Sequence, residues 1–166
     1  MQYDRLSIYG FAVDYPEDWR VELKPESDRN RGNLAFHSPA KDNMFISWEI
    51  LERVQKRYTS LAEQVNGVLE NIKKSRGVKS VEVLERKELE INGHKGVFTH
   101  LKVTSIHAIF FFKKRVILQE LWSLNVYCEQ TARFFALYGM SSSDERSLQQ
   151  ANIFKHMQKT FKCHPE

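Results

Sequence analysis

The dipeptide Asn92-Gly93, set between two long runs of alternating apolar and polar residues, is the feature of this sequence that most restricts its fold. The run before it is V-E-V-L-E-R-K-E-L-E-I, and the run after it is H-K-G-V-F-T-H-L-K-V. A two-residue hairpin turn of the common type needs positive φ at both central residues, and Asn-Gly adopts this conformation readily. The sequence therefore predicts an antiparallel hairpin that turns at Asn92-Gly93.

Further strands are predicted on both sides of this hairpin. Before it, L-S-I-Y-G-F-A-V-D-Y-P changes parity at Tyr9-Gly10, where a bulge or tight turn fits, and Pro16 ends the pairing. The runs W-R-V-E-L, N-L-A-F-H-S-P and N-M-F-I-S-W-E-I-L follow. After it come I-H-A-I-F-F-F, a basic break at Lys113-Lys114-Arg115, V-I-L-Q-E-L-W-S-L-N-V-Y-C-E and R-F-F-A-L-Y-G-M. Because short turns join most of these strands, we expect a largely antiparallel sheet.

Two helices are predicted to shield this sheet. Ser60 and Glu63 form a capping box, in which the hydroxyl and the carboxylate satisfy free amide groups at the start of a helix. The apolar stripe of this helix comprises Leu61, Val65, Val68, Leu69 and Ile72, and Gly77 fits a left-handed residue beyond its end. A second helix is expected over residues 144–161, with Leu148, Ala151, Phe154, Met157 and Phe161 on its inner face. Helices placed between strand hairpins indicate an α+β domain.

Composition predicts a single domain over residues 1–166. Of these residues, 42% are hydrophobic and 28% are charged, which excludes a disordered chain. The net charge of +4 is modest and spread along the chain, which argues against a nucleic-acid partner. No apolar run approaches the ~20 residues of a membrane-spanning helix, and M-Q-Y-D-R-L-S-I-Y-G has no basic-then-apolar leader. We therefore expect an untargeted cytoplasmic protein with no membrane partner.

The run Y-G-F-A-V-D-Y-P-E-D-W, residues 9–19, resembles the opening signature of the PsbP-like superfamily, and the matching positions are Gly10, Phe11, Pro16 and Trp19. The later order of a helix, a strand meander and a closing helix that ends in a Phe is also similar. The resemblance implies an α-β-α sandwich, with a mostly antiparallel sheet between helices, that acts by binding rather than by catalysis. We interpret the four matched residues as a structural motif, in which Trp19 buries ~150–250 Å².

The sequence contains no recognisable catalytic motif. It has no phosphate-binding glycine loop, no His-Glu-x-x-His helix, no Cys-x-x-Cys pair and no nucleophile-elbow serine. We interpret its two cysteines as free thiols, with Cys128 buried in a strand and a disulfide as the less favoured alternative. Cys163 and His164 are interpreted as surface residues near a frayed terminus, although soft sulfur and imidazole ligands, with His156 nearby, leave metal binding open. No catalytic residue, metal site or cofactor is assigned.

Glu120 is the one charged residue among the alternate positions of its strand that are otherwise apolar. In V-I-L-Q-E-L-W-S-L-N-V-Y-C it shares its parity with Trp122 and Leu124. In a regular strand, Glu120 points to the apolar side and must be paired, protonated or beside a pocket. A bulge or strand end near Gln119 that turns it outward is the favoured alternative. A small polar pocket lined by Glu120 and Trp122 is the candidate ligand-binding site.

The favoured function is a non-enzymatic binding or adaptor domain that engages a protein partner, or a second copy as a homodimer, through a sheet face or edge. The runs I-F-F-F at residues 109–112 and Phe134-Phe135 place apolar groups on both faces of the sheet. One face is expected to lie under helices, and the other must be covered by a helix, a loop or a partner. The alternative is a small-molecule binding protein or a cryptic enzyme with a pocket between sheet and helix near Glu120. Single-stranded nucleic-acid binding through exposed aromatic residues ranks last.

Overall fold

Nine strands and three helices make up the part of the chain that the structure, a computed structural model, describes: residues 1–142 and 144–165. Ser143 and Glu166, which the predicted domain over residues 1–166 includes, lie outside the described residues. In chain order the elements are β1 (Tyr3–Ile8), β2 (Phe11–Pro16), β3 (Arg20–Leu23), β4 (Gly32–His37), β5 (Asn43–Ile50), α1 (Leu51–Gln55), α2 (Leu61–Lys73), β6 (Val78–Ile91), β7 (His94–Phe110), β8 (Lys113–Cys128), β9 (Arg133–Ser142) and α3 (Arg146–Thr160).

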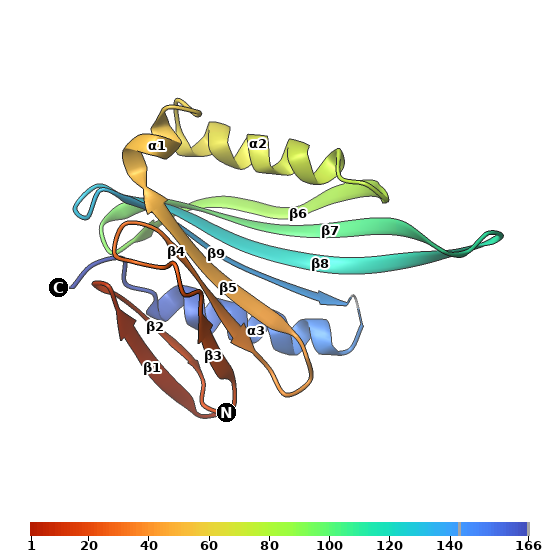
Figure 1. Ribbon diagram of the computed structural model, residues 1–166, viewed down its shortest axis with the longest axis horizontal. Coiled ribbons are helices and arrows are strands. Elements are labelled where there is room, and N and C mark those ends of the chain that lie inside the picture. Colours follow the sequence, from red (N-terminus) through yellow and green to blue (C-terminus); the bar gives the residue numbers. More distant parts are fainter. Residues whose placement is uncertain (143, 166) are drawn as a thin grey trace.

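Seven of the strands form one sheet in the order β3-β4-β5-β9-β8-β7-β6, and β1 pairs with β2 as a separate hairpin. Every strand pairing is antiparallel, so the predicted sheet type is confirmed. Helix α2 lies on one face of the large sheet, while α3 and the β1–β2 hairpin lie on the other (Figure 1). The three layers form the α-β-α sandwich that the resemblance implied.

Each face of the sheet has its own apolar core, because side chains alternate between the two faces along every strand. Under α1 and α2, the core includes Leu61, Val65, Leu69, Val97, Leu101 and Phe134. Under α3 and the β1–β2 hairpin, it includes Phe11, Trp48, Phe98, Trp122, Phe135, Phe154 and Phe161. The neighbours Phe134 and Phe135 therefore enter opposite cores, as their adjacent positions in a strand predict.

The two predicted tight turns are confirmed. Asn92 and Gly93 have φ values of 55° and 85° and join Ile91 to its partner His94. Tyr9 and Gly10, with φ of 50° and 79°, make the same kind of turn between β1 and β2. Both turns rely on a glycine for the second left-handed residue, where a side chain introduces strain.

The capping box at the start of α2 is confirmed with one difference. Ser60 Oγ accepts a hydrogen bond from the backbone N–H of Glu63 at 3.1 Å. The Glu63 carboxylate reaches one residue further back than a standard box, to the backbone N–H of Thr59 at 2.6 Å and to the Thr59 hydroxyl. The first turn of α2 is thus stabilised by side-chain hydrogen bonds from both Ser60 and Glu63.

Two helical predictions need correction, and one short helix was missed. Leu148 was expected on the inner face of the last helix but is 71% exposed, because the buried face of α3 runs through Gln150, Ile153, Phe154 and Met157. Val68 of α2 is also exposed, at the edge of the stripe formed by Leu61, Val65 and Leu69. The single turn α1, which follows β5 directly, was not predicted.

Candidate functional site

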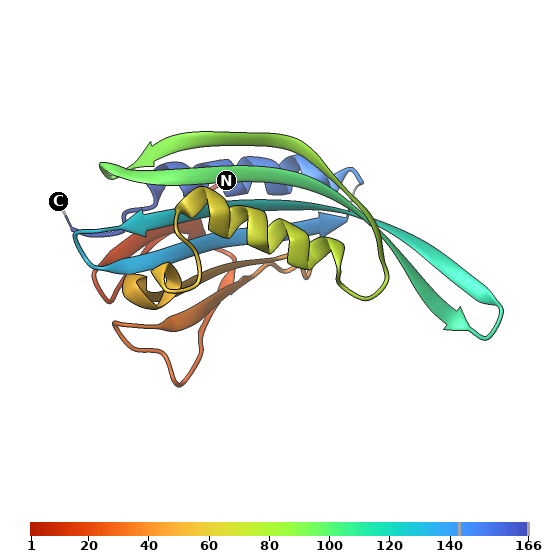
Figure 2. The ribbon, with the colours of Figure 1, turned by 90° about the horizontal axis from the view of Figure 1, so that it is seen from above.

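The β7–β8 hairpin projects far beyond the rest of the protein (Figures 1 and 2). Strand β6 pairs with β7 only as far as Ser105, and the last backbone hydrogen bond from this side joins Ile106 N to Gly77 O. Strand β9 pairs with β8 only from Gln119 onward. Among the described residues, 107–118 therefore have strand partners only within the β7–β8 hairpin itself. We call residues 107–118 the finger.

The finger ends in three exposed aromatic side chains. Phe111 and Phe112 form the turn and are 101% and 99% exposed, and Phe110 beside them is largely exposed as well. The turn falls earlier than predicted, since Lys113, Lys114 and Arg115 belong to β8 rather than to a break between strands. The end of the finger is therefore an exposed apolar patch bordered by charged residues.

The charge of the finger has a single sign. Lys113, Lys114 and Arg115 follow the phenylalanines, and no Asp or Glu occurs between Glu90 and Glu120. Side chains of the finger are exposed on both faces of the ribbon, apart from the half-buried Ile117. The finger therefore combines an apolar end with an uncompensated positive charge behind it.

At the base of the finger, the Glu120 carboxylate is held by a contact with a histidine. The β8–β9 pairing runs without a shift from Gln119 to Cys128, so the predicted bulge or strand end that turns Glu120 outward is wrong. Glu120 shares a face with Trp122, and its Oε1 lies 2.9 Å from Nε2 of His100 on β7. The ring of His100 stacks on Trp122 with 5.2 Å between centroids. The carboxylate on the apolar face thus has a hydrogen-bond partner.

Ligand binding at Glu120 and Trp122 stays a prediction. Three cavities in the described chain, of about 440, 770 and 370 Å³, are lined by other residues. The four motif residues lie where packing groups are expected: Gly10 is in the first turn, Pro16 ends β2, and Phe11 and Trp19 are buried.

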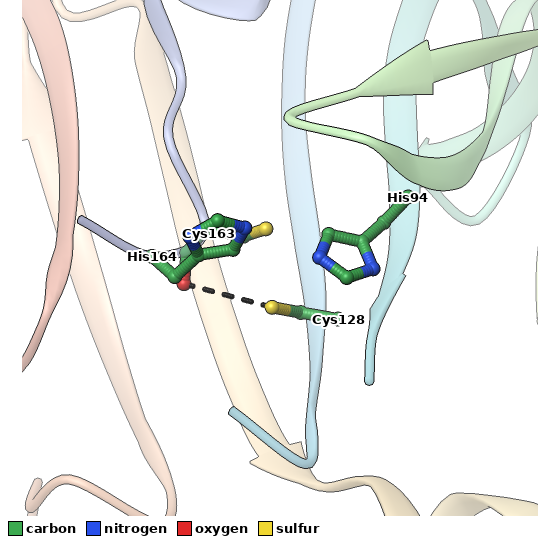
Figure 3. Close-up of side chains that lie close together, drawn as sticks. All are labelled: His94, Cys128, Cys163 and His164. Carbon is green, nitrogen blue, oxygen red and sulfur yellow. Dashed lines mark hydrogen bonds between the residues drawn. The ribbon is translucent and has the colours of Figure 1, made fainter. Parts of the chain in front are cut away.

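Four side chains of the kinds that bind soft metal ions meet at the end of the sheet opposite the finger (Figure 3). His94 begins β7, Cys128 ends β8, and Cys163 and His164 follow α3. One ligand atom from each, a cysteine Sγ or a ring nitrogen, lies within 4.8 Å of the others. We call these four residues the Cys/His cluster.

The interpretation of Cys163 and His164 as surface residues is wrong. After α3 the chain returns to β2, where Lys162 and Ala12 exchange backbone hydrogen bonds of 2.9 and 2.8 Å. This pairing carries Cys163 into the core with no solvent exposure and leaves His164 9% exposed. His156 is elsewhere, because its ring stacks on Tyr3 at 3.7 Å.

Two hydrogen bonds involve the sulfur of Cys128. Thr131 Oγ1 donates to Cys128 Sγ at 3.0 Å, and the protonated Cys128 thiol donates to the Cys163 carbonyl oxygen at 3.8 Å. Donation from the Cys163 thiol, with a further contribution from Thr131, lowers the pKa of Cys128 to about 5. The bond to Cys128, together with burial, raises the pKa of Cys163. The pair therefore favours one thiolate and one thiol.

His164 joins the cluster to the Asn92-Gly93 turn. Its Nδ1 lies 2.6 Å from the carbonyl oxygen of Pro165, and its Nε2 lies 2.7 Å from Nδ2 of Asn92. The rings of His94 and His164 meet edge to face with 5.2 Å between their centroids. The same turn that organises the β6–β7 hairpin thus places both histidines.

Comparison with known proteins identifies the fold. No protein-family model and no curated protein matches the sequence. The solution structure of cyanobacterial PsbP (CyanoP) from Synechocystis sp. PCC 6803 is similar, with a TM-score of 0.66 and 11% identity over 96% of this chain and 91% of CyanoP. The Ran-binding protein Mog1p of Saccharomyces cerevisiae gives a TM-score of 0.61 at 9% identity, over 97% of this chain and 95% of Mog1p.

A third solved structure, protein PA94 of unknown function from Pseudomonas aeruginosa, gives a TM-score of 0.54 at 13% identity and covers both chains fully. Together with the layers described above, these similarities define an α-β-α sandwich built on an antiparallel sheet. This is the PsbP-like fold that residues 9–19 predicted. Identities this low establish the fold and leave the activity open.

Within the described chain, no helix has the length and apolar character to cross a membrane. The expected cytoplasmic location and the single-domain organisation stay predictions.

Proposed function

We propose that this protein is a non-enzymatic binding domain that docks a protein partner through the finger. The observation that carries the proposal is the pair Phe111 and Phe112, fully exposed at the end of a ribbon that nothing else in residues 1–142 and 144–165 covers. Exposed apolar surface costs about 25 cal/mol per Å² relative to burial, and a partner that covers the rings removes this cost.

The edges of the finger favour a protein over a lipid surface. Residues 107–118 pair only within the ribbon in the described chain, so each edge presents unpaired backbone N–H and C=O groups. An extended segment of a partner satisfies these groups by adding a strand. Hydrocarbon satisfies none of them, and an open strand edge in a bilayer is strongly disfavoured.

The positive charge of the finger favours a partner with an acidic surface. Lys113, Lys114 and Arg115 stand behind the aromatic tip with no acidic residue in the finger. Two copies of the finger repel each other because both are positively charged. A partner with an acidic surface around an apolar pocket attracts the finger and can bury the phenylalanine rings in that pocket. Mog1p, which shares the fold, is a Ran-binding protein, and this is a precedent for protein binding but does not identify the partner of this chain.

The test compares two double variants with the wild type. F111S/F112S removes the tip, and V83S/L84S removes two half-exposed apolar residues of β6 as a matched control. Each is used to capture proteins from an extract of the cells that make the protein, and a recovered protein is then purified and titrated. We expect a protein that binds the wild type and V83S/L84S equally and binds F111S/F112S at least 10-fold more weakly.

Three outcomes contradict the proposal. The first is that F111S/F112S and the wild type bind the same proteins with the same affinities. The second is self-association of the wild type, measured by sedimentation, that F111S/F112S abolishes, because the tip is then a homodimer contact. The third is tip-dependent binding to anionic phospholipid vesicles with no tip-dependent protein.

A further inference from the structure

The Cys/His cluster has the donor set of a structural metal site, and we propose that His94, Cys128, Cys163 and His164 bind one Zn²⁺ ion. Zinc takes two thiolates and two imidazoles in a tetrahedron with Zn–S near 2.3 Å and Zn–N near 2.0–2.1 Å. In that geometry the ligand atoms lie about 3.3–3.8 Å apart. The four ligand atoms already lie within 4.8 Å of one another, so small side-chain movements close the site.

Backbone structure holds each of the three ligand-bearing segments in place. His94 follows the Asn92-Gly93 turn directly, and Cys128 is the last residue of β8. The segment with Cys163 and His164 is fixed by the pairing of Lys162 with Ala12. A site assembled from pre-positioned segments loses little conformational entropy when the ion binds.

The hydrogen bonds around the cluster are those that orient zinc ligands. When His164 Nδ1 carries the proton, it donates to the Pro165 carbonyl and leaves Nε2 free to bind the metal in place of its contact with Asn92. Thr131 donates to the sulfur of Cys128. Such outer partners fix the tautomer of a histidine ligand and the direction of a thiolate.

Charge and access also fit an ion of this kind. Two thiolates and Zn²⁺ sum to zero charge, so the buried cysteines are neutralised as a unit. A cavity of about 770 Å³ reaches His94, and another of about 370 Å³ reaches His164, so the cluster lies between two openings to solvent. The cluster has no carboxylate, and Ca²⁺ and Mg²⁺ require oxygen ligands.

Cobalt absorption tests the proposal on the reduced, metal-free full chain. Both cysteines of the sequence belong to the cluster, so a sulfur-to-cobalt charge-transfer band reports this site alone. We expect one Co²⁺ per chain with the visible bands of tetrahedral coordination, and complete displacement by one equivalent of Zn²⁺. H94Q and H164Q each weaken Co²⁺ binding at least 10-fold, and C128S and C163S remove most of the sulfur band.

The controls separate this proposal from folding defects and from the proposed function. H107Q changes an exposed histidine of the finger and leaves the Co²⁺ affinity unchanged. F111S/F112S binds Co²⁺ like the wild type, whatever its effect on partner binding. Should a cysteine variant fail to fold, as judged by circular dichroism, H94Q carries the test, because His94 lies outside the buried core.

Three outcomes overturn the proposal. One is the absence of a sulfur-to-cobalt band in the reduced protein. Another is a sulfur-to-cobalt band in H94Q and H164Q that forms with the same Co²⁺ affinity as in the wild type, since the histidines are then not ligands. The last is a Cys128–Cys163 disulfide that, once reduced, gives a protein that binds neither Co²⁺ nor Zn²⁺.

Discussion

His100 Nε2 lies 2.9 Å from Glu120 Oε1, and the ring of His100 is stacked on Trp122 of the neighbouring strand. The stacked ring places the imidazole where it pairs with the carboxylate at the margin of the core. The apolar face of β8 thereby accommodates a charge without a bulge. Glu120 lies close to the point where β9 begins to pair with β8 and the finger ends.

Removing the Glu120 carboxylate is expected to destabilise the fold. E120A leaves a partly buried imidazole without its partner and lowers the free energy of unfolding by about 1–3 kcal/mol. E120Q keeps an acceptor oxygen and costs less than E120A. Urea denaturation of the three proteins measures this, and equal stabilities of E120A and E120Q contradict the role given to the hydrogen bond.

Substitution of a core phenylalanine is expected to destabilise the fold strongly, and substitution of the tip phenylalanines to have little effect on stability. Phe135 is buried between Phe11 and Phe161, and F135A lowers the free energy of unfolding by about 3–5 kcal/mol. F111S/F112S changes side chains that only solvent touches and shifts the free energy of unfolding by about 0.5 kcal/mol or less. Thermal and urea unfolding distinguish the two. A large loss in F111S/F112S shows that the tip is packed rather than free.

The start of α2 predicts a pH effect on stability. The Thr59 hydroxyl and backbone N–H donate to Glu63 and hold the pKa of its carboxyl below the usual value of 4.5. Since the folded pKa is the lower one, the stabilisation is complete above the unfolded pKa and disappears as pH falls through the folded pKa. E63Q is therefore less stable than the wild type at neutral pH, and the difference vanishes in acid. Parallel stability curves for the two proteins contradict this prediction.

Zinc is expected to stabilise the fold if the proposed site is correct. At a free Zn²⁺ concentration about 100-fold above Kd, binding to the native state adds about 2.7 kcal/mol to the free energy of unfolding. For a chain of this size, that raises Tm by roughly 5–10 °C. Differential scanning fluorimetry with and without a chelator measures the change. C163S is expected to show no zinc-dependent rise in Tm, and an equal rise in both proteins contradicts the assignment.

Features set by a few adjacent residues were predictable from the sequence. The turns at Tyr9-Gly10 and Asn92-Gly93 depend on local backbone preferences, and the start of α2 depends on Ser60 and Glu63, so each was predicted at its correct place. Leu148 was misplaced because successive steps of three residues drift about 60° around a helix, so a stripe counted back in such steps from Met157 leaves the buried face. Leu148 therefore lies nearly opposite Gln150 and Ile153 on the helix.

The finger and the Cys/His cluster depend on contacts between distant segments. The finger exists because β7 and β8 extend beyond the ends of β6 and β9 at this end of the sheet. The residues around Phe111 do not indicate where the neighbouring strands end. In the β7–β8 pairing, Gly96 lies opposite Val126, and continuing this register by two residues sets His94 opposite Cys128. The sequence does not reveal this register, because a shift between Ala108 and Phe110 makes a count that starts at the turn wrong by one residue. Cys163 joins them only because the chain returns to β2.

That return has a consequence for how the protein is made. Phe161 and Cys163 complete the core over Phe11, and Lys162 closes against Ala12. A ribosome that has released the chain only through β9 has therefore produced a sheet whose lower layer is still unsealed. Final closure waits until the segment after α3 has left the exit tunnel, and until then Phe11 and its neighbours form an exposed apolar surface of the kind that favours aggregation of incompletely folded chains.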